Sequence, residues 1–318
     1  MWFPSWLKKL SGVVRLSGSK RYSERRTKRV HGISLETTLK PISPIPGEWD
    51  SIFKGRGQQF SGFKEFHPSD NPSLIDIPRF ATTGEMFIVE RIPRRGIEVT
   101  IVMDFSSSCS INPAPDIRDN AALLIAAAAV KMDSPLALVG FGADIHFKHS
   151  LDSPRIQFKR LADKIQEQNT HSNSSVMQEG TSFSSVVPYI RNVTPQNSLV
   201  FLISDFLGGD GLTELLSIMR GRVDCTPVLV DTSRIWEDMP LGRFELRAVD
   251  PETGKVAEMF LTPSKIREIR EFHRERKERL ASMFRRNGFY HATLNDKDPE
   301  SCMRALTVCF KQKMWRRQ

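Results

Sequence analysis

From residue 97 onward the sequence alternates short apolar runs with longer helical segments, and this alternation restricts the fold more than any other feature. The runs Ile97–Asp104 and Ser198–Ser204 are almost continuously apolar, as expected for strands of a parallel sheet that is covered on both faces. Strands that alternate with helices predict an α/β fold, in which a mainly parallel sheet carries helices on both faces.

The same order of elements continues to the C-terminus. Further strands are predicted at 136–141, 144–147, 224–230 and 289–294, of which 144–147 is a short edge strand. Helices are predicted at 117–132, 154–168, 182–192, 212–220, 264–287 and 299–313. Residues 231–262 interrupt this rhythm with two strand-like runs around Asp-Pro-Glu-Thr-Gly. A turn of that composition between two such runs predicts an inserted hairpin, Phe244–Val249 with Val256–Leu261.

The first 96 residues have a different composition from the rest. Residues 1–32 contain nine Lys or Arg and one Glu, so they carry +8 of the chain's net charge of +9, which predicts a basic, disordered tail. Residues 33–96 are rich in proline with one strand predicted at Glu85–Glu90, and we expect an irregular extension that packs on the core. Residues 97–318 then form the α/β domain with its inserted hairpin at 231–262.

The apolar segments and the cysteines argue against a membrane-spanning, a secreted or a zinc-binding protein. No segment reaches the roughly 18–20 apolar residues of a membrane-spanning helix, and the first nine residues do not resemble a secretory signal. The four cysteines include no Cys-x-x-Cys pair, which argues against a zinc site of that type. We therefore expect reduced thiols in a cytoplasmic protein, with peripheral contact at the inner face of the membrane left open by the basic tail.

Hydroxyl and carboxylate side chains follow two of the predicted strands. Asp104, Ser106 and Ser108 come at the end of the first core strand, and Asp205 directly follows Ser198–Ser204. Because the carboxyl ends of parallel strands meet at one edge of the sheet, we expect these groups to lie together. Thr181 precedes a predicted helix, in a loop that can reach the same edge.

These oxygen groups suit a hard divalent cation, with Mg²⁺ as the first choice and Mn²⁺ or Ca²⁺ as alternatives. The hydroxyls of Ser106, Ser108 and Thr181 can bind directly, while Asp104 and Asp205 can bind through waters, since Mg²⁺ gives up its hydration reluctantly. A shell of mainly neutral hydroxyls leaves the ion under-neutralised. The ion is then expected to take an external carboxylate from an acidic protein partner.

Two other functions use the same features differently. A metal-dependent hydrolase could use the loop that contains Ser106 and Ser108, but the chain has no Gly-x-Ser-x-Gly elbow and no histidine placed to activate either serine. The chain has no phosphate-binding loop of an ATPase either. A binder of anionic membrane surfaces or of nucleic acid could use residues 1–32, with nucleic acid the less favoured ligand.

The spacing Asp104-x-Ser106-x-Ser108, followed by Thr181 and Asp205, resembles the metal-ion-dependent adhesion site of von Willebrand factor A domains. The likeness covers about 97–313. It implies a Rossmann-like von Willebrand factor A fold and a non-enzymatic, metal-dependent protein-interaction module. It also implies that all five of these residues serve the metal ion.

A second resemblance lies upstream, in Phe63-Lys64-Glu65-Phe66-His67-Pro68-Ser69-Asp70 followed by Leu74-Ile75-Asp76. This pattern is similar to the signature of domain-of-unknown-function family fifty-eight, and the turn of the inserted hairpin also fits that family. The sequence departs from the signature at three places, where Gly, Arg and Trp are replaced by Ser69, Ser73 and Ile77. The resemblance implies an adaptor for a MoxR-type AAA+ ATPase, since family members are commonly encoded beside such ATPases.

Overall fold

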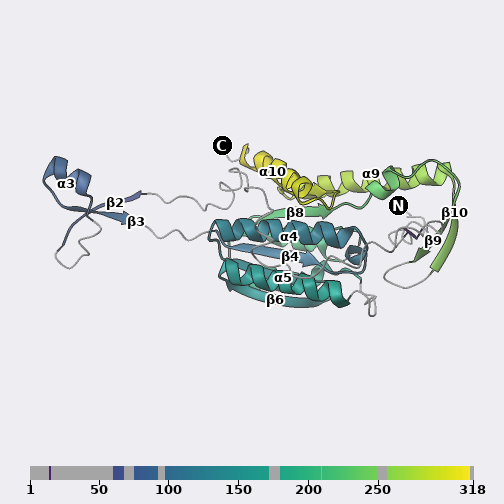
Figure 1. Ribbon diagram of the computed structural model, residues 1–318, viewed down its shortest axis with the longest axis horizontal. Helices are drawn as coiled ribbons and strands as arrows, with labels where there is room; N and C mark the ends of the chain where they lie inside the picture. The colour runs from purple at the N-terminus through teal and green to yellow at the C-terminus, as the bar shows by residue number, and fades with distance from the viewer. Residues whose placement is uncertain are drawn as a thin grey trace.

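The computed structural model describes residues 14–15, 60–67, 75–91, 97–171, 180–208, 210–249 and 256–315. Its centre is a six-stranded sheet of order β11-β8-β7-β4-β5-β6 (Figure 1). The strands are β4 (Val99–Asp104), β5 (Leu136–Phe141), β6 (Ile145–Asp152), β7 (Leu199–Ser204), β8 (Asp224–Val230) and β11 (Ala292–Leu294). All neighbouring pairs are parallel except β5 with β6, so the predicted mainly parallel sheet is confirmed.

Helices cover both faces of this sheet, because side chains alternate between the faces along each buried strand. On β4, Ile101 and Met103 pack into one core while Val102 packs into the other. The first core is closed by α4 (Ala114–Lys131), α5 (Pro154–His171) and α10 (Pro299–Trp315). The second is closed by α6 (Val187–Asn192), α7 (Leu212–Met219) and α9 (Pro263–Arg286). The predicted α/β class with helices on both faces is therefore confirmed.

Two predicted elements have different bounds in the structure. The helix expected at 182–192 is divided into a 3-10 turn, η4 (Phe183–Ser185), and α6. Pro188 lies in the first turn of α6, where a missing backbone N–H does no harm, so it favours a new helix start there. The edge strand expected at 144–147 extends to Asp152 as β6, which alternates exposed and half-buried residues along most of its length.

The insertion after β8 begins with a short helix, α8 (Arg234–Glu237), and continues as the predicted hairpin. Strands β9 (Phe244–Val249) and β10 (Val256–Leu261) pair antiparallel with Phe244 opposite Leu261. A short strand, β1 (Val14–Arg15), pairs with the other edge of β9. The hairpin leads directly into α9, whose N-cap Thr262 accepts a hydrogen bond from the backbone N–H of Lys265.

The described part of the N-terminal extension contains β2 (Phe60–Glu65), α3 (Ile77–Thr83) and β3 (Phe87–Arg91). The sequence predicted only the strand near β3. Asp76 caps α3 by accepting the N–H of Arg79, and Gly84 ends it with a φ of 72°. Apart from β1, the predicted basic tail at 1–32 lies outside the described residues, as does much of 33–96, so the proposed domain boundaries stay predictions.

Two further findings concern membrane-spanning helices and the cysteines. No helix in the described ranges combines the length and hydropathy that crossing a bilayer requires. The four cysteines, Cys109, Cys225, Cys302 and Cys309, are all buried and none forms a disulfide.

Candidate metal centre

Asp104 and Asp205 lie at the carboxyl ends of two neighbouring strands. Asp104 is the last residue of β4, Asp205 directly follows β7, and the two strands pair in parallel with Met103 opposite Ile203. Both side chains are buried, with 0% and 2% of their surface exposed. The sheet therefore brings the two predicted carboxylates to one edge, as the sequence indicated.

Two hydrogen bonds orient the Asp104 carboxylate. Its Oδ1 accepts the backbone N–H of Ser106 at 2.9 Å, and its Oδ2 accepts the hydroxyl of Ser204 at 2.6 Å. Burial, and then the charge of Asp205, raise the pKa of Asp104 to about 6 in spite of these bonds. A carboxylate held at this cost in a buried place is a feature of binding and catalytic sites.

Asp205 is oriented by its own loop and by a distant helix. Its Oδ1 accepts the backbone N–H of Leu207 at 2.9 Å, and its backbone carbonyl accepts a hydrogen bond from the guanidinium of Arg276 on α9. Burial raises the pKa of the Asp205 carboxyl, although Arg276, Leu207 and the side chains of Ser108 and Cys109 act to lower it.

The two serines lie in the tight loop after β4, and both are buried. The hydroxyls of Ser106 and Ser108 are 3.2 Å apart, and Ser108 begins the 3-10 turn η3 (Ser108–Ser110). Arg118 of α4 fastens this loop: its Nη1 donates to the Asp104 carbonyl at 3.1 Å, and its guanidinium lies 4.0 Å from the centre of the Phe105 ring. The buried guanidinium of Arg118 therefore fixes the position of this loop.

Thr181 is buried, and its hydroxyl has no hydrogen-bond partner. The next residue, Ser182, donates its N–H to the carbonyl of Gly142, which follows β5, and bridges to Asp210 beyond β7. These bonds place Thr181 at the edge of the sheet that also carries the two aspartates. A buried hydroxyl without a partner normally costs free energy, so a ligand at this position would satisfy it.

Sequence reasoning missed three groups at this site. Ser204 orients Asp104, and Arg276 reaches Asp205 from a helix 71 residues later in the chain. The third group is Cys109, which in the sequence is one of four cysteines without a spacing that indicates a ligand set. Its Sγ and one oxygen from each of Asp104 and Asp205 all lie within 4.8 Å of one another. Burial, with the negative charges of Asp205 and Asp104, keeps the pKa of the Cys109 thiol well above its ordinary value.

The donor set fits a divalent cation. It combines two buried carboxylates, of which the Asp205 charge raises the pKa of Asp104, with two adjacent hydroxyls and an unpartnered third. Carboxylate and hydroxyl oxygens are the ligands of Mg²⁺ and Ca²⁺, and a divalent charge would relieve the repulsion between the carboxylates. Asp104, Ser106, Ser108, Thr181 and Asp205 would hold such an ion. Their role as metal ligands stays a prediction.

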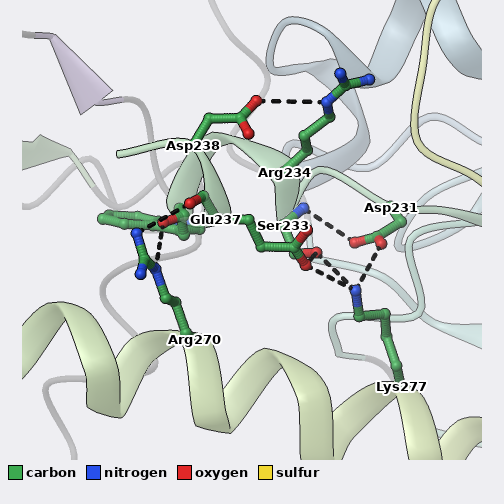
Figure 2. A network of polar contacts seen from close by, with 8 residues as sticks. Asp231, Ser233, Arg234, Glu237, Asp238, Arg270 and Lys277 are labelled. Carbon is green, nitrogen blue, oxygen red and sulfur yellow. Dashed lines mark hydrogen bonds and ion pairs between the residues drawn. The ribbon is translucent and has the colours of Figure 1, made fainter. Parts of the chain in front are cut away.

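A second polar network occupies the neighbouring strand end (Figure 2). Asp231 directly follows β8, and its Oδ1 accepts the N–H of Ser233 at 2.9 Å. The ammonium of Lys277 on α9 lies 3.1 Å from Asp231 Oδ2, 3.0 Å from Ser233 Oγ and 3.1 Å from Glu237 Oε1. A cation of the protein itself therefore neutralises this strand end.

Arg270, seven residues before Lys277 and so about two turns nearer the N-terminus of α9, contacts the same short helix. Its Nε donates to the carbonyl of Trp236 at 2.9 Å, and its Nη2 donates to the carbonyls of Glu237 at 2.9 Å and Met239 at 2.5 Å. Helix α8 leaves C-terminal carbonyls without intrahelical donors, and Arg270 satisfies them. The result is a rigid connection between α8 and α9 beside the candidate metal centre.

Several solved structures resemble this chain. The conserved hypothetical protein BatB from Bacteroides thetaiotaomicron is 14% identical, with a TM-score of 0.40 over 68% of this chain and 98% of that one. A von Willebrand factor type A protein from Catenulispora acidiphila is 12% identical, with a TM-score of 0.37 over 69% and 43%. Proximal thread matrix protein 1 from the mussel byssus, described with a zinc-occupied MIDAS motif, is 13% identical, with a TM-score of 0.32 over 42% and 38%.

The sequence itself gives a more direct assignment. No curated protein matches the chain. The sequence model of one family, described as "Protein of unknown function DUF58", matches residues 63–281. That range covers the upstream signature, both strand ends of the candidate metal centre and most of α9. Because the match spans more than half of the chain, the protein belongs to the DUF58 family.

Proposed function

We propose that this protein is a non-enzymatic, metal-dependent interaction module, which binds an acidic side chain of a partner protein through a divalent cation. The observation that carries the proposal is the buried pair Asp104 and Asp205 at neighbouring strand ends. Arg118 and Arg276 reach these residues through their backbone carbonyls, which leaves carboxylate oxygens for an external cation. Mg²⁺ is the first choice, with Mn²⁺ or Ca²⁺ as alternatives.

The charge of the loaded site supports an anionic ligand. A divalent ion would neutralise the two carboxylates, and the half-buried Arg276 would then leave the site with a net positive charge. A carboxylate from a partner complements that charge and can complete the coordination of the ion. An Asp or Glu side chain at the tip of a partner's loop is therefore the ligand that the site fits best.

The partner is inferred from the family rather than from the site. The resemblance of the upstream signature to this family implies an adaptor of a MoxR-type AAA+ ATPase, and we propose that role for this chain in the cytoplasm. In that role the ATPase or its client supplies the acidic residue. Peripheral contact with an anionic membrane through residues 1–32 is compatible with this role, because it uses a different part of the chain.

The test is metal binding by the purified protein, followed by partner capture. Isothermal titration with Mg²⁺ and Mn²⁺ should show one site per chain in the wild type and in Asp210→Asn, which removes an exposed charge near the same edge. Asp104→Ala should lose that site. Because Asp104 is expected to bind the ion through water, its loss should lower the metal affinity by roughly 10- to 100-fold, as loss of an outer partner of a metal ligand does.

Partner capture is then measured with the MoxR-type ATPase from the same organism, in Mg²⁺ and in EDTA. Retention of the ATPase by the wild type and by Asp210→Asn in Mg²⁺, but by neither in EDTA nor by Asp104→Ala, is the expected result. Equal retention in all conditions would contradict a metal-dependent contact. Equal metal affinity of Asp104→Ala and the wild type would contradict the metal centre itself.

A further inference from the structure

We infer that Cys109 gives the same centre a second mode of metal binding, in which a thiophilic ion such as Zn²⁺ or Cd²⁺ is held by the Cys109 thiolate together with Asp104 and Asp205. This inference rests on the proposed function for the location of the centre. It adds a ligand outside the five predicted residues and a competing class of ion. A thiophilic ion would exclude Mg²⁺, since both modes need the same two carboxylates.

The geometry of the three groups carries the inference. Cys109 Sγ and one oxygen of each aspartate lie within 4.8 Å of one another, and in the described ranges this is the one group of three such side chains close enough to hold a metal ion. In a tetrahedral zinc site, bonds of 2.0–2.3 Å place ligand atoms about 3.5 Å apart. Bringing the three ligand atoms from within 4.8 Å to about 3.5 Å of one another requires shifts of about 1 Å, which small side-chain rotations can supply.

The local fold places the thiol and the carboxylates on different elements. Cys109 lies in the turn η3, while Asp104 ends β4 and Asp205 follows β7. All three side chains are almost completely buried. An ion bound among them would connect the two strands to the turn, and the unpartnered hydroxyl of Thr181 at the same edge offers a further donor.

The chemistry separates the two classes of ion. The side chain of Cys109 hydrogen-bonds to Asp205, so a metal that binds sulfur would take the place of the thiol proton, which leaves to solvent. Soft thiolate ligands select Zn²⁺ and related ions, whereas Mg²⁺ prefers oxygen and would leave the thiol protonated. Zinc with three protein ligands keeps one open position, fewer than hydrated Mg²⁺ keeps for a partner.

The experiment is a Cd²⁺ titration of the full chain, which follows the ultraviolet charge-transfer absorption of a cadmium–thiolate bond. The wild type should gain this absorption with one Cd²⁺ per chain, and Cys109→Ser should not. Cys225→Ser is the matched control, because Cys225 is another buried thiol, located in β8, and it should behave as the wild type. Mn²⁺ binding, measured by electron paramagnetic resonance, should be retained in Cys109→Ser.

Two competition measurements show whether the centre is shared. Excess Mg²⁺ should reduce the cadmium–thiolate absorption, and Asp104→Asn should lose both this absorption and Mn²⁺ binding. Absorption that persists in Cys109→Ser or in Asp104→Asn would overturn the inference. If the wild type binds Mn²⁺ but never shows the absorption, the second mode is wrong and the proposed function stands. If it binds neither ion, both proposals fail.

Discussion

Asp205 and Asp231 occupy equivalent places at the ends of neighbouring strands, but the pKa values of their carboxyl groups are shifted in opposite directions. Each directly follows a buried strand, and each accepts a backbone N–H from two residues further on at 2.9 Å. Burial raises the pKa of Asp205 despite its polar contacts. Burial also acts to raise the pKa of Asp231, but the bonds from Ser233 and the charge of Lys277 hold it below its usual value.

Consecutive residues of α9 produce this difference. Arg276 donates to the backbone carbonyl of Asp205, whereas Lys277 places its ammonium 3.1 Å from the carboxylate of Asp231. Because successive residues on a helix point about 100° apart, one helix can serve both strand ends. Lys277 thereby pairs directly with the Asp231 carboxylate, whereas Arg276 offsets only part of the effect of burial on the pKa of Asp205. The carboxylates of Asp104 and Asp205 can together take a cation from solution.

The largest effect that tests this comparison is stabilisation by the metal ion. A ligand that binds only the folded state stabilises it by about 2.7 kcal/mol at 100 times its Kd. Mn²⁺ at that excess should raise the free energy of unfolding of the wild type by this amount, and that of Asp104→Asn by almost nothing. Urea unfolding with and without Mn²⁺ measures the difference. An equal response of the two proteins would break the comparison.

Without metal, Asp104→Asn should increase stability. A folded-state pKa of about 6, against an ordinary 3.8, means that the folded protein holds the charge at a cost of up to about 3 kcal/mol. We expect a gain of about 1–2 kcal/mol, because asparagine replaces the carboxylate's hydrogen bonds imperfectly. Since the raised pKa favours protonation in the folded state, the gain should be full above pH 6 and should disappear as the pH falls towards 4.

Urea unfolding in EDTA at pH 8, 6 and 4 measures this dependence. The expected sign is unusual, because most substitutions of buried residues lower stability. A loss of stability at pH 8, or a gain that does not depend on pH, would show that the Asp104 charge is already compensated within the fold.

Asp231→Asn should have the opposite sign. It removes the charged partner of Lys277 and weakens the bond from Ser233, so we expect a loss of about 1.5–3 kcal/mol at pH 7, typical of a hydrogen bond to a charged group. Because the pKa of Asp231 is lowered on folding, this stabilisation is present at neutral pH and is lost only in strong acid. Urea unfolding of Asp104→Asn and Asp231→Asn under the same conditions measures both effects. A gain in unfolding free energy in both variants would contradict the proposed difference between the two strand ends.

The sequence predicted one member of this comparison and not the other. Asp104 and Asp205 follow apolar strands with a recognisable spacing of serines, so strand order and alternation alone place them at one edge. Lys277 meets Asp231 across 46 residues, and Arg276 meets Asp205 across 71. Such pairs depend on how α9 docks after the insertion. The sequence predicts α9 only as a charged amphipathic helix. Nothing in the spacing of its Lys and Arg residues shows which of them contact the strand ends.

The same limit applies to Cys109. Its position after Ser108 predicts burial, which the structure confirms, but a single cysteine carries no spacing that indicates a ligand set. Its proximity to both aspartates arises from the turn η3, and turns of this kind follow from local hydrogen bonds such as that from Ser110 Oγ to the Ser106 carbonyl. The oxygen groups of the proposed metal centre could therefore be predicted from the sequence, and the thiol beside them could not.

The smallest expected effect concerns the exposed rim of the Lys277 network. Arg234 pairs with Asp238 and Asp296, each at 3.4 Å, but its side chain is 54% exposed and theirs are 72% and 39% exposed. Water and salt screen such pairs, and they contribute about 0–1 kcal/mol. Arg234→Ala should therefore change the urea midpoint far less than Asp231→Asn does. If Arg234→Ala lost as much unfolding free energy as Asp231→Asn, α8 would be held through its exposed side chains and not through Lys277 and Arg270. The difference between the two strand ends would then no longer depend on α9.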